Sequence, residues 1–322
     1  MPTLGIDLGG TNIAAGIVDN EGRLTVHGSV PTLPKRGPLA ITSDMNALCR
    51  RLMEEAGLAL HEIDSVGIAT PGSVLYEEGV VERAENLGFD HFPIVESLRS
   101  LLPVNHIYIE NDANAAAWAE AICGAARGTK SSVMITLGTG VGGGIVFDGK
   151  IYSGHNGGAA EIGHMLIEKG GRLCPCGRRG CFEAYCSATA LILSTKEAMA
   201  ECERQGLPTL MTEAAAAYGK VNGRVAFDAM KRGDVYARRV VESFRDYLAE
   251  GIINIINLLQ PEVILIGGGI CNEREALLSP DFLERIDGAQ YTKDARRKTR
   301  VCIAELGNDA GIIGAAMLGR SL

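Results

Sequence analysis

The sequence reads IDLGGTNIAAGIVDNEG at residues 6–22, and it reads ITLGTGVGGGIVFDG at residues 135–149. Each segment has the pattern of a strand, a turn of small residues, a second strand and a polar turn that contains glycine. The shared pattern predicts two related halves, each opening with a β-hairpin. The hairpin turns hold more glycine than a plain connection needs, which indicates that they do more than join strands.

Strands and helices alternate around the two hairpins. We expect strands at SVGIAT (65–70) and HIYIEN (106–111), and a buried strand in EVILIGGG (262–269) that runs into a triple-glycine turn. Helices are expected at 39–57, from residue 113 onward, at 233–259 and at 308–320, the last with Asn308 or Asp309 as its cap. This alternation predicts an α/β fold.

The totals exclude several classes of protein. The 322 residues suffice for two domains, and 46% apolar with 22% charged residues suits a globular chain with a sizeable core. A net charge of −8 argues against nucleic acid as a partner, although backbone amides can still hold a nucleotide. No targeting segment is visible, and polar residues interrupt the most apolar stretch, 248–270, so we expect a cytoplasmic protein without membrane contact.

The turn of the first hairpin is a candidate phosphate loop. Glycines there let backbone N–H groups approach phosphate oxygens, and neighbouring polar side chains can add hydrogen bonds. An aspartate beside phosphates requires a cation between them, so Mg²⁺ is implied. The residues concerned are Asp7, Gly9, Gly10, Thr11 and Asn12. Taken alone, the segment also fits an ordinary hairpin bulge.

Two further glycine-rich turns favour the nucleotide interpretation. One contains Gly138, Thr139, Gly140 and Gly142, and the other is Gly267, Gly268 and Gly269. None has the Gly-Lys-Ser/Thr of a P-loop, and the residues after Asn12 read as a strand where a Rossmann unit would have a helix. Two hairpin loops and a glycine platform resemble the actin-like ATPase (ribonuclease H-like) fold, in which duplicated halves clamp a nucleotide.

A cysteine cluster is a candidate zinc site. Cys174, Cys176 and Cys181 lie within eight residues, and tetrahedral structural Zn²⁺ requires a fourth ligand. His164 is the preferred ligand, with Cys186 and His155 as alternatives. Free thiols or a redox switch are the other interpretations. The remaining cysteines, Cys49, Cys123, Cys202, Cys271 and Cys302, stand among apolar neighbours and are expected to be buried.

Acidic residues near the cysteine cluster and after the strand at 106–111 suggest the chemistry. Zinc would hold Glu161 and Glu183 close together, as carboxylates that could accept hydrogen bonds from the hydroxyls of a sugar. Asp112 follows a strand, at the edge where α/β proteins bind ligands, and could take a proton from an attacking hydroxyl, with Asn111 beside it. The alternative for Asp112 is a helix N-cap.

Motifs along nearly the whole chain resemble the ROK family of sugar kinases and repressors, and within it the glucokinases. They are DLGGTN (7–12), TPGSV (70–74), ENLGF (85–89), ENDANAAAWAE (110–120), TLGTGVGGGIVFDGKIYSG (136–154), EIGHM (161–165), CPCGRRGCFEAYCSATAL (174–191) and PEVILIGGG (261–269). The combination of EIGH with C-x-C-x4-C-x-E is highly specific, whereas the glycine turns alone are not.

The resemblance implies ATP-dependent phosphorylation of the 6-hydroxyl of a hexose, with glucose as the expected substrate. By it, Asp112 is the catalytic base, and ATP lies on the loops at 7–12 and 138–144 with Gly267 to Gly269 near the adenosine. The implied hexose-binding residues are Asn86, Asn111, Asp112, Glu161, His164 and Glu183, and the implied zinc ligands are His164, Cys174, Cys176 and Cys181.

The resemblance also implies a domain organisation and an oligomeric state. Two domains would flank a nucleotide and sugar cleft: a smaller one of residues 1–112 with about 305–322, and a larger one of residues 113–304 with a zinc-binding insertion at about 155–187. A homodimer or homotetramer is expected. The DNA-binding segment of the repressor branch is not expected, because Asp7 already belongs to the first loop.

Two departures from the family pattern bear on the site. Ala160 precedes Glu161 where the family often has glycine, and Phe89 stands where its glucokinases have tryptophan, which leaves the preferred sugar open. The alternatives are a kinase of N-acetylmannosamine, N-acetylglucosamine, fructose or allose, and a sugar sensor without catalysis. Polyphosphate in place of ATP as the donor also stays open.

Overall fold

The computed structural model describes residues 1–292 and 295–320, and it divides into two compact units. Unit 1 comprises Met1–Met134, Gly144–Ala160 and the C-terminal segment from Ala304, and unit 2 comprises Ile135–Gly143 and Glu161–Ile303. The chain therefore passes between the units several times. The domain limits expected from the sequence stay a prediction.

The first five-stranded sheet has the order β3-β2-β1-β4-β8. Its strands are β1 (Thr3–Leu8), β2 (Asn12–Val18), β3 (Leu24–Pro31), β4 (Ser65–Thr70) and β8 (His106–Asn111). β2 is antiparallel to both β1 and β3, and β4 is parallel to both β1 and β8. A smaller sheet in the order β5-β6-β7 consists of β5 (Ser73–Leu75), β6 (Val80–Ala84) and β7 (Phe89–Phe92).

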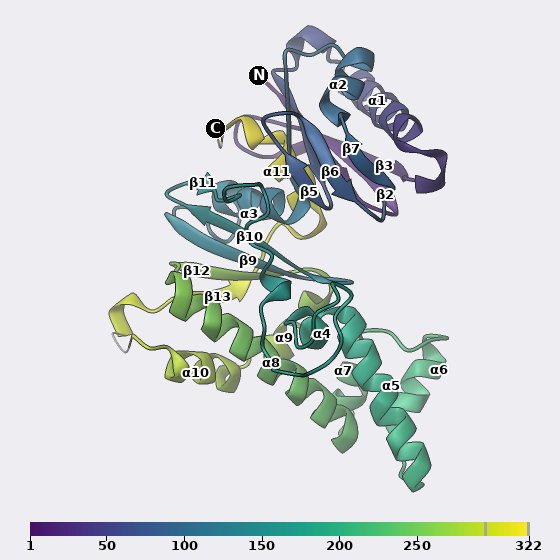
Figure 1. Ribbon diagram of the computed structural model, residues 1–322, viewed down its shortest axis with the longest axis vertical. Coiled ribbons are helices and arrows are strands. Elements are labelled where there is room, and N and C mark those ends of the chain that lie inside the picture. The colour runs from purple at the N-terminus through teal and green to yellow at the C-terminus, as the bar shows by residue number, and fades with distance from the viewer. Residues whose placement is uncertain (293–294, 321–322) are drawn as a thin grey trace. The chain divides into compact units, whose positions relative to one another are not determined.

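Helices cover the first sheet (Figure 1). α1 (Pro38–Glu55) packs on β2, β3 and α2 (Ile94–Leu101), whereas α11 (Ala310–Ala316) packs on β1, β4 and α3 (Asp112–Cys123). Two strand glycines allow this second contact. A Cβ at Gly5 would collide with the backbone oxygen of Ile312, and a Cβ at Gly67 with that of Ala315. α11 is therefore held close beneath the strand that carries Asp7.

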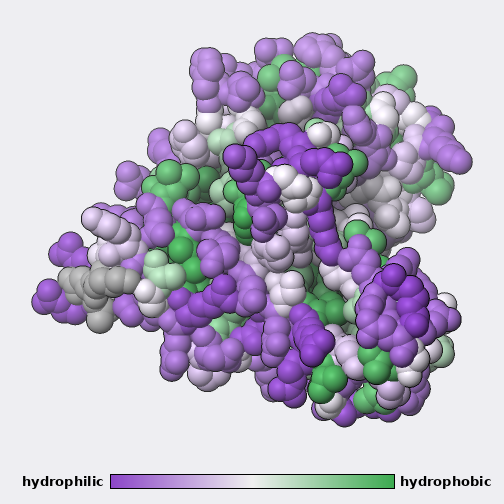
Figure 2. Space-filling model, turned by 60° about the horizontal axis from the view of Figure 1, so that its bottom comes forward, coloured by the Kyte–Doolittle hydropathy of each residue, from purple (hydrophilic) through white to green (hydrophobic). Residues whose placement is uncertain are grey.

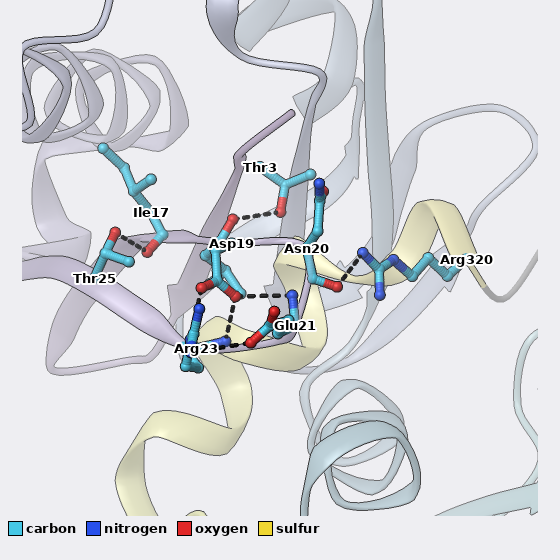
Figure 3. Close-up of polar contacts among 9 residues, drawn as sticks. Thr3, Ile17, Asp19, Asn20, Glu21, Arg23, Thr25 and Arg320 are labelled. Atoms are coloured by element: carbon cyan, nitrogen blue, oxygen red, sulfur yellow. Dashed lines mark hydrogen bonds and ion pairs between the residues drawn. The ribbon is translucent and has the colours of Figure 1, made fainter.

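The polar turn after β2 is held by one carboxylate (Figure 3). Asp19 accepts hydrogen bonds from the backbone N–H groups of Glu21 and Arg23, at 2.8 and 3.0 Å, and from Nε of Arg23 at 2.8 Å. These bonds, with the backbone N–H of Arg23 as the largest cause, lower the pKa of Asp19 below its ordinary value. Arg320 donates to the backbone oxygen of Asn20 in the same turn, which ties the end of the described chain to the hairpin.

The second five-stranded sheet has the order β11-β10-β9-β12-β13. Its strands are β9 (Ser131–Leu137), β10 (Val141–Phe147), β11 (Lys150–Ile151), β12 (Val263–Gly267) and β13 (Arg300–Ile303). Numbered along the chain, each five-stranded sheet has the order 3-2-1-4-5, and each begins with one of the two glycine-rich hairpins. The duplication that the two quoted segments predict is therefore present in the strand order.

Unit 2 is rich in helices. They are α4 (Glu183–Cys186), α5 (Ala188–Gln205), α6 (Leu210–Ala217), α7 (Val225–Lys231), α8 (Val235–Leu259), α9 (Arg274–Leu277) and α10 (Pro280–Ala289). The long α8 packs against α4, α5, α7 and α10 (Figure 1). Asp234 caps its N-terminus by accepting from the N–H groups of Tyr236 and Ala237. It ends at Leu259, and Gln260 follows as its C-cap before Pro261, which disfavours a continued helix.

Short 3₁₀ helices complete the described elements. They are Pro34–Arg36, Leu60–Glu62, Ile162–His164, Gly269–Glu273, Ala295–Arg297, Gly307–Asp309 and Leu318–Arg320.

The sequence-based elements agree well with the structure, and the α/β class is confirmed. The expected strands at 65–70 and 106–111 are β4 and β8 with the same limits, and the expected long helix is α8. The closing helix is shorter than expected: α11 ends at Ala316, and Asp309 is at its N-cap position without a side-chain capping bond.

Hydrophilic side chains dominate the face drawn in Figure 2, where apolar side chains form small separate groups. Within residues 1–292 and 295–320, no helix is both long and apolar enough to cross a membrane.

Candidate active site

The first glycine-rich loop, the candidate phosphate loop, lies between β1 and β2 in unit 1. Its turn closes with a hydrogen bond of 2.9 Å from Gly9 N–H to the backbone oxygen of Asn12. The fully buried Thr32 then fastens it twice, by its hydroxyl to the backbone oxygen of Gly9 at 2.7 Å and by its N–H to that of Thr11 at 2.9 Å. Thr32 thus fixes the loop from β3, a role that the sequence did not suggest.

Asn86 lies against this loop. A Cβ at Gly10 would be 3.0 Å from Nδ2 of Asn86, so a glycine leaves room for the amide. Asn86, expected from the resemblance to bind sugar, and Gly10, expected to bind phosphate, are therefore neighbours within unit 1.

Asp7 and Asp112 form an acidic pair in unit 1. Burial raises the pKa of Asp7 from the ordinary value of 3.8 to about 6, and the negative charge of Asp112 adds to the rise. The carboxylate of Asp7 contacts the position of Gly311 in α11, where a Cβ would collide with it. Two interacting carboxylates at a phosphate loop favour a divalent cation with oxygen ligands, because its charge relieves their repulsion.

The helix cap before α3 corrects one sequence-based interpretation. Asn111 is the N-cap, and its Oδ1 accepts from the N–H groups of Ala113 and Asn114 at 2.9 and 3.3 Å. Asp112 is the first helical residue, so the N-cap alternative for Asp112 is wrong. Nδ2 of Asn111 donates to the backbone oxygen of Gly72 at 3.1 Å. Hydrogen bonds therefore hold both the oxygen and the nitrogen of this side-chain amide.

Glu110 is a buried carboxylate that the sequence analysis did not select. One oxygen accepts from the N–H of Asn111 at 2.8 Å and from Nδ2 of Asn114 at 3.0 Å, and the other accepts from the hydroxyl of Ser153 at 3.0 Å. Glu110 thereby joins the end of β8, the first turn of α3 and the segment after β11. It fixes the backbone immediately before Asp112.

The group of Cys and His side chains that could hold a metal, here called the metal cluster, lies in unit 2. The ligand atoms of His164, Cys174, Cys176 and Cys181 all lie within 4.8 Å of one another. The sulfur atoms of Cys176 and Cys181 are 3.7 Å apart, and so are Sγ of Cys174 and Nδ1 of His164. A tetrahedron with Zn–S bonds of about 2.3 Å has S···S edges of about 3.8 Å, so this donor set fits Zn²⁺.

The alternatives for the fourth ligand are not members of this group. Cys186 is buried with its sulfur 3.8 Å from the backbone oxygen of Phe244, and the group of four contains His164 and not His155. Without a metal, burial raises the pKa of Cys174 to about 12 and raises that of Cys181, so protons must leave when metal binds.

The turn that presents the cysteines is tight. Cys174 N–H donates to the backbone oxygen of Arg178 at 2.8 Å, and Gly177 N–H donates to that of Cys174 at 2.9 Å. Gly177 and Gly180 have φ of 88° and 83°, in the left-handed region that glycine tolerates. The two glycines therefore allow Cys181 to return to Cys174 and Cys176.

The second glycine-rich loop, residues 138–143, comprises the turn between β9 and β10 and the first residues of β10, and it lies in unit 2. Gly138 N–H donates to the backbone oxygen of Gly140 at 3.0 Å. The start of α5 fastens the loop, since Ala188 N–H donates to the oxygen of Gly138 at 2.8 Å and the hydroxyl of Thr189 donates to that of Thr139 at 2.7 Å. Gly268, after β12, lies directly against the backbone of Leu137.

The two glutamates beside the metal cluster differ in their surroundings. Glu161 is exposed, with its carboxylate 4.0 Å from Nε2 of His164. Glu183 accepts a hydrogen bond of 2.9 Å from Val141 N–H, and its other oxygen lies 3.8 Å from Sγ of Cys174. Residues of the Cys/His group thus lie beside both carboxylates, and Glu183 also contacts the loop at 138–143.

Each unit, taken by itself, gathers a glycine loop with carboxylates. Unit 1 brings together Asp7, Gly10, Asn86 and Asp112, and unit 2 brings the loop at 138–143 together with the metal cluster and Glu183. Phe89, the residue that departs from the family pattern, is buried against Phe92 in β7.

The ROK family model matches residues 3–321. The chain belongs to the ROK family. It is 36% identical over 327 residues to a glucokinase of Halalkalibacterium halodurans, covering 98% of this chain and 94% of that protein. It is 31% identical over 321 residues to an N-acetylmannosamine kinase of Salmonella typhimurium, covering 99% of each.

A solved structure is similar over the whole length. It is a ROK family glucokinase from Streptomyces griseus in complex with glucose and AMPPNP, with a TM-score of 0.81, 33% identity and 100% coverage of both chains. This likeness confirms the actin-like ATPase fold that the glycine turns and the duplication predict.

Proposed function

We propose that this ROK protein is an ATP-dependent hexose kinase that phosphorylates the 6-hydroxyl of glucose. One observation carries the proposal: the chain aligns over its full length with a glucokinase whose structure contains glucose and AMPPNP. The duplicated hairpin loops and the Asp7–Asp112 pair supply what such a reaction needs, namely backbone amides for phosphates and carboxylates for a cation and a proton.

The nucleotide would be held by the two glycine loops, with Gly267 to Gly269 near the adenosine. Mg²⁺ would bind at Asp7 and neutralise charge on the transferred phosphoryl group. Because the charge of Asp112 contributes to the raised pKa of Asp7, a cation there would also favour the ionised form of both groups.

The sugar would be held by amides and carboxylates, and Asp112 would act as the general base. Asp112 takes the proton of the 6-hydroxyl as that oxygen attacks the γ-phosphate. Its position in the first turn of α3 is fixed by the Asn111 cap and by Glu110. The assigned sugar-binding residues are Asn86, Asn111, Glu161, His164 and Glu183.

Zn²⁺ would be structural. His164, Cys174, Cys176 and Cys181 would complete a tetrahedral set, and bound zinc would fix the tight turn and the first residues of α4. The assembly that we propose is a homodimer or homotetramer, and the cytoplasm is the proposed compartment.

A second candidate substrate is N-acetylmannosamine, because a kinase of that sugar is 31% identical over 99% of this chain. Measuring ADP release with Mg-ATP and a panel of hexoses and N-acetylhexosamines tests the proposal. The highest kcat/KM is expected with glucose. A tenfold preference for N-acetylmannosamine would transfer the assignment to that sugar, and ATP hydrolysis that does not depend on sugar would exclude kinase activity.

The base assignment has its own test. Asp112→Asn is expected to retain glucose binding by calorimetry and to lower kcat by a factor on the order of 10² to 10⁴. A kcat close to that of the unmodified protein would remove Asp112 from this role.

A further inference from the structure

The second phosphate loop, residues 138–143, is in direct contact with the metal cluster through Glu183. One oxygen of this side chain accepts the N–H of Val141 at 2.9 Å, and the other lies 3.8 Å from Sγ of Cys174. Glu183 follows Cys181 by two residues and begins α4. A single carboxylate therefore touches a loop amide on one side and a proposed zinc ligand on the other.

Two glycines make this approach possible. A Cβ at Gly140 would collide with the carboxylate of Glu183, and a Cβ at Gly163 would collide with the backbone oxygen of Val141. Gly163 immediately precedes His164, so Val141 contacts both metal-ligand segments. Its N–H donates to Glu183, two residues after Cys181, and its carbonyl oxygen lies close to Gly163.

Further contacts of the loop come from a different element. The start of α5 holds backbone oxygens of Gly138 and Thr139, through Ala188 and Thr189. The loop is thus fastened at its first residues by α5 and at Val141 by the metal-ligand segments. A loop that cradles phosphate with backbone amides depends on such fixed geometry, because each amide must point at an oxygen.

We infer that Glu183 is a positioning residue for the nucleotide, which transmits the geometry of the metal cluster to the phosphate loop. The inference rests on the proposed function, because the proposed function assigns ATP to this loop. It goes beyond the sugar-binding role that the family resemblance implies, because the bond to Val141 acts on the loop and not on the sugar. The zinc site is then coupled to nucleotide affinity as well as to the sugar.

Nucleotide affinity measured without sugar separates the two roles. Calorimetric titration with the Mg²⁺ complex of AMPPNP is expected to show binding on the order of tenfold weaker for Glu183→Ala, which removes the acceptor for Val141. Glu183→Gln keeps one acceptor oxygen, and its affinity is expected within about threefold of the unmodified protein. Glu161→Ala is the matched control. Glu161 is an exposed neighbour of His164, and this substitution should leave the affinity for the nucleotide unchanged.

Two further measurements test whether a substitution disturbs the metal cluster itself. Zinc content is determined for each protein, and Glu183→Asp, one methylene shorter, is expected to keep zinc but to bind nucleotide as weakly as Glu183→Ala. Amide hydrogen exchange at Val141 should accelerate in both of these variants and not in Glu161→Ala.

The outcomes distinguish this inference from the proposed function. If Glu183→Ala and Glu183→Asp retain zinc and bind nucleotide as tightly as the unmodified protein, the positioning role is refuted while the kinase assignment stands. If the unmodified protein binds no nucleotide, the proposed function fails and the inference fails with it.

Discussion

The ionised carboxylate of Asp7 lowers the free energy of unfolding, and this effect can be measured. Its pKa is raised from 3.8 to about 6, first by burial and then by the charge of Asp112. Because the pKa is higher in the folded protein than in the unfolded chain, the folded state binds this proton more tightly. The stabilising contribution is therefore complete below about pH 3.8 and is lost as the pH rises toward about 6.

The magnitude follows from the difference between the two pKa values. Each pKa unit corresponds to about 1.4 kcal/mol, so an ionised Asp7 costs the apo protein about 3 kcal/mol of unfolding free energy at neutral pH. Asp7→Asn removes this cost. The variant is expected to exceed the unmodified protein in stability by about 3 kcal/mol near pH 7.5 and by about 1.5 kcal/mol near pH 5. It should also lose most kinase activity, because Asp7 is the proposed Mg²⁺ ligand.

Urea unfolding from about pH 5 to 8, without Mg²⁺ or nucleotide, measures this difference. Asp19→Asn is a control of opposite sign. Hydrogen bonds led by the backbone N–H of Arg23 lower the pKa of Asp19, so its stabilising contribution is present and constant from about pH 5 to 8 and is lost only at lower pH, as the pH falls through the folded-state pKa (Figure 3). A stability difference for Asp7→Asn that is zero, or that does not change with pH, would refute the reasoning.

Three other predictions concern further residues of the two units. Ala160 has φ of 65°, so Ala160→Gly should stabilise the protein by roughly 0.5–1 kcal/mol in urea unfolding, and destabilisation would contradict the strain assigned there. Cys181→Ser should lower zinc content from about one ion per chain, whereas Cys123→Ser, outside the cluster, should not; equal zinc in both would exclude this ligand set. Glu110→Ala should cost about 1–3 kcal/mol, because the hydrogen-bond donors that it accepts from lose their partner, and a cost below about 0.5 kcal/mol would show that water replaces it.

The fold could be predicted largely because its signals are local. A strand, a glycine-rich turn and a second strand are adjacent in sequence, and the pattern recurs at 6–22 and 135–149. The spacing of cysteines in 174–181 likewise indicates a metal site without knowledge of the rest of the chain. The strand order of the two sheets then follows the duplication.

The hydrogen bonds that hold the loops and carboxylates of the site in place could not be predicted, because they join residues far apart in sequence. Thr32 reaches Gly9 from a segment without a motif of its own, and the motif that contains Ser153 gives no local sign of its bond to Glu110. The choice between Asn111 and Asp112 as cap depends on where β8 ends, and adjacent polar residues give no local signal for that. The bond from Val141 to Glu183 was missed for the same reason, since sequence places Glu183 near the zinc ligands but does not show the loop beside it.

Phosphoryl transfer to glucose tests the central claim most directly. Phosphorus NMR can follow a reaction of the purified protein with Mg-ATP and glucose, and mass spectrometry of the sugar identifies the product. We predict a phosphomonoester on the 6-hydroxyl, formed in equal amount to ADP. Release of ADP with inorganic phosphate and unmodified glucose, or no consumption of ATP with any hexose, would contradict the account.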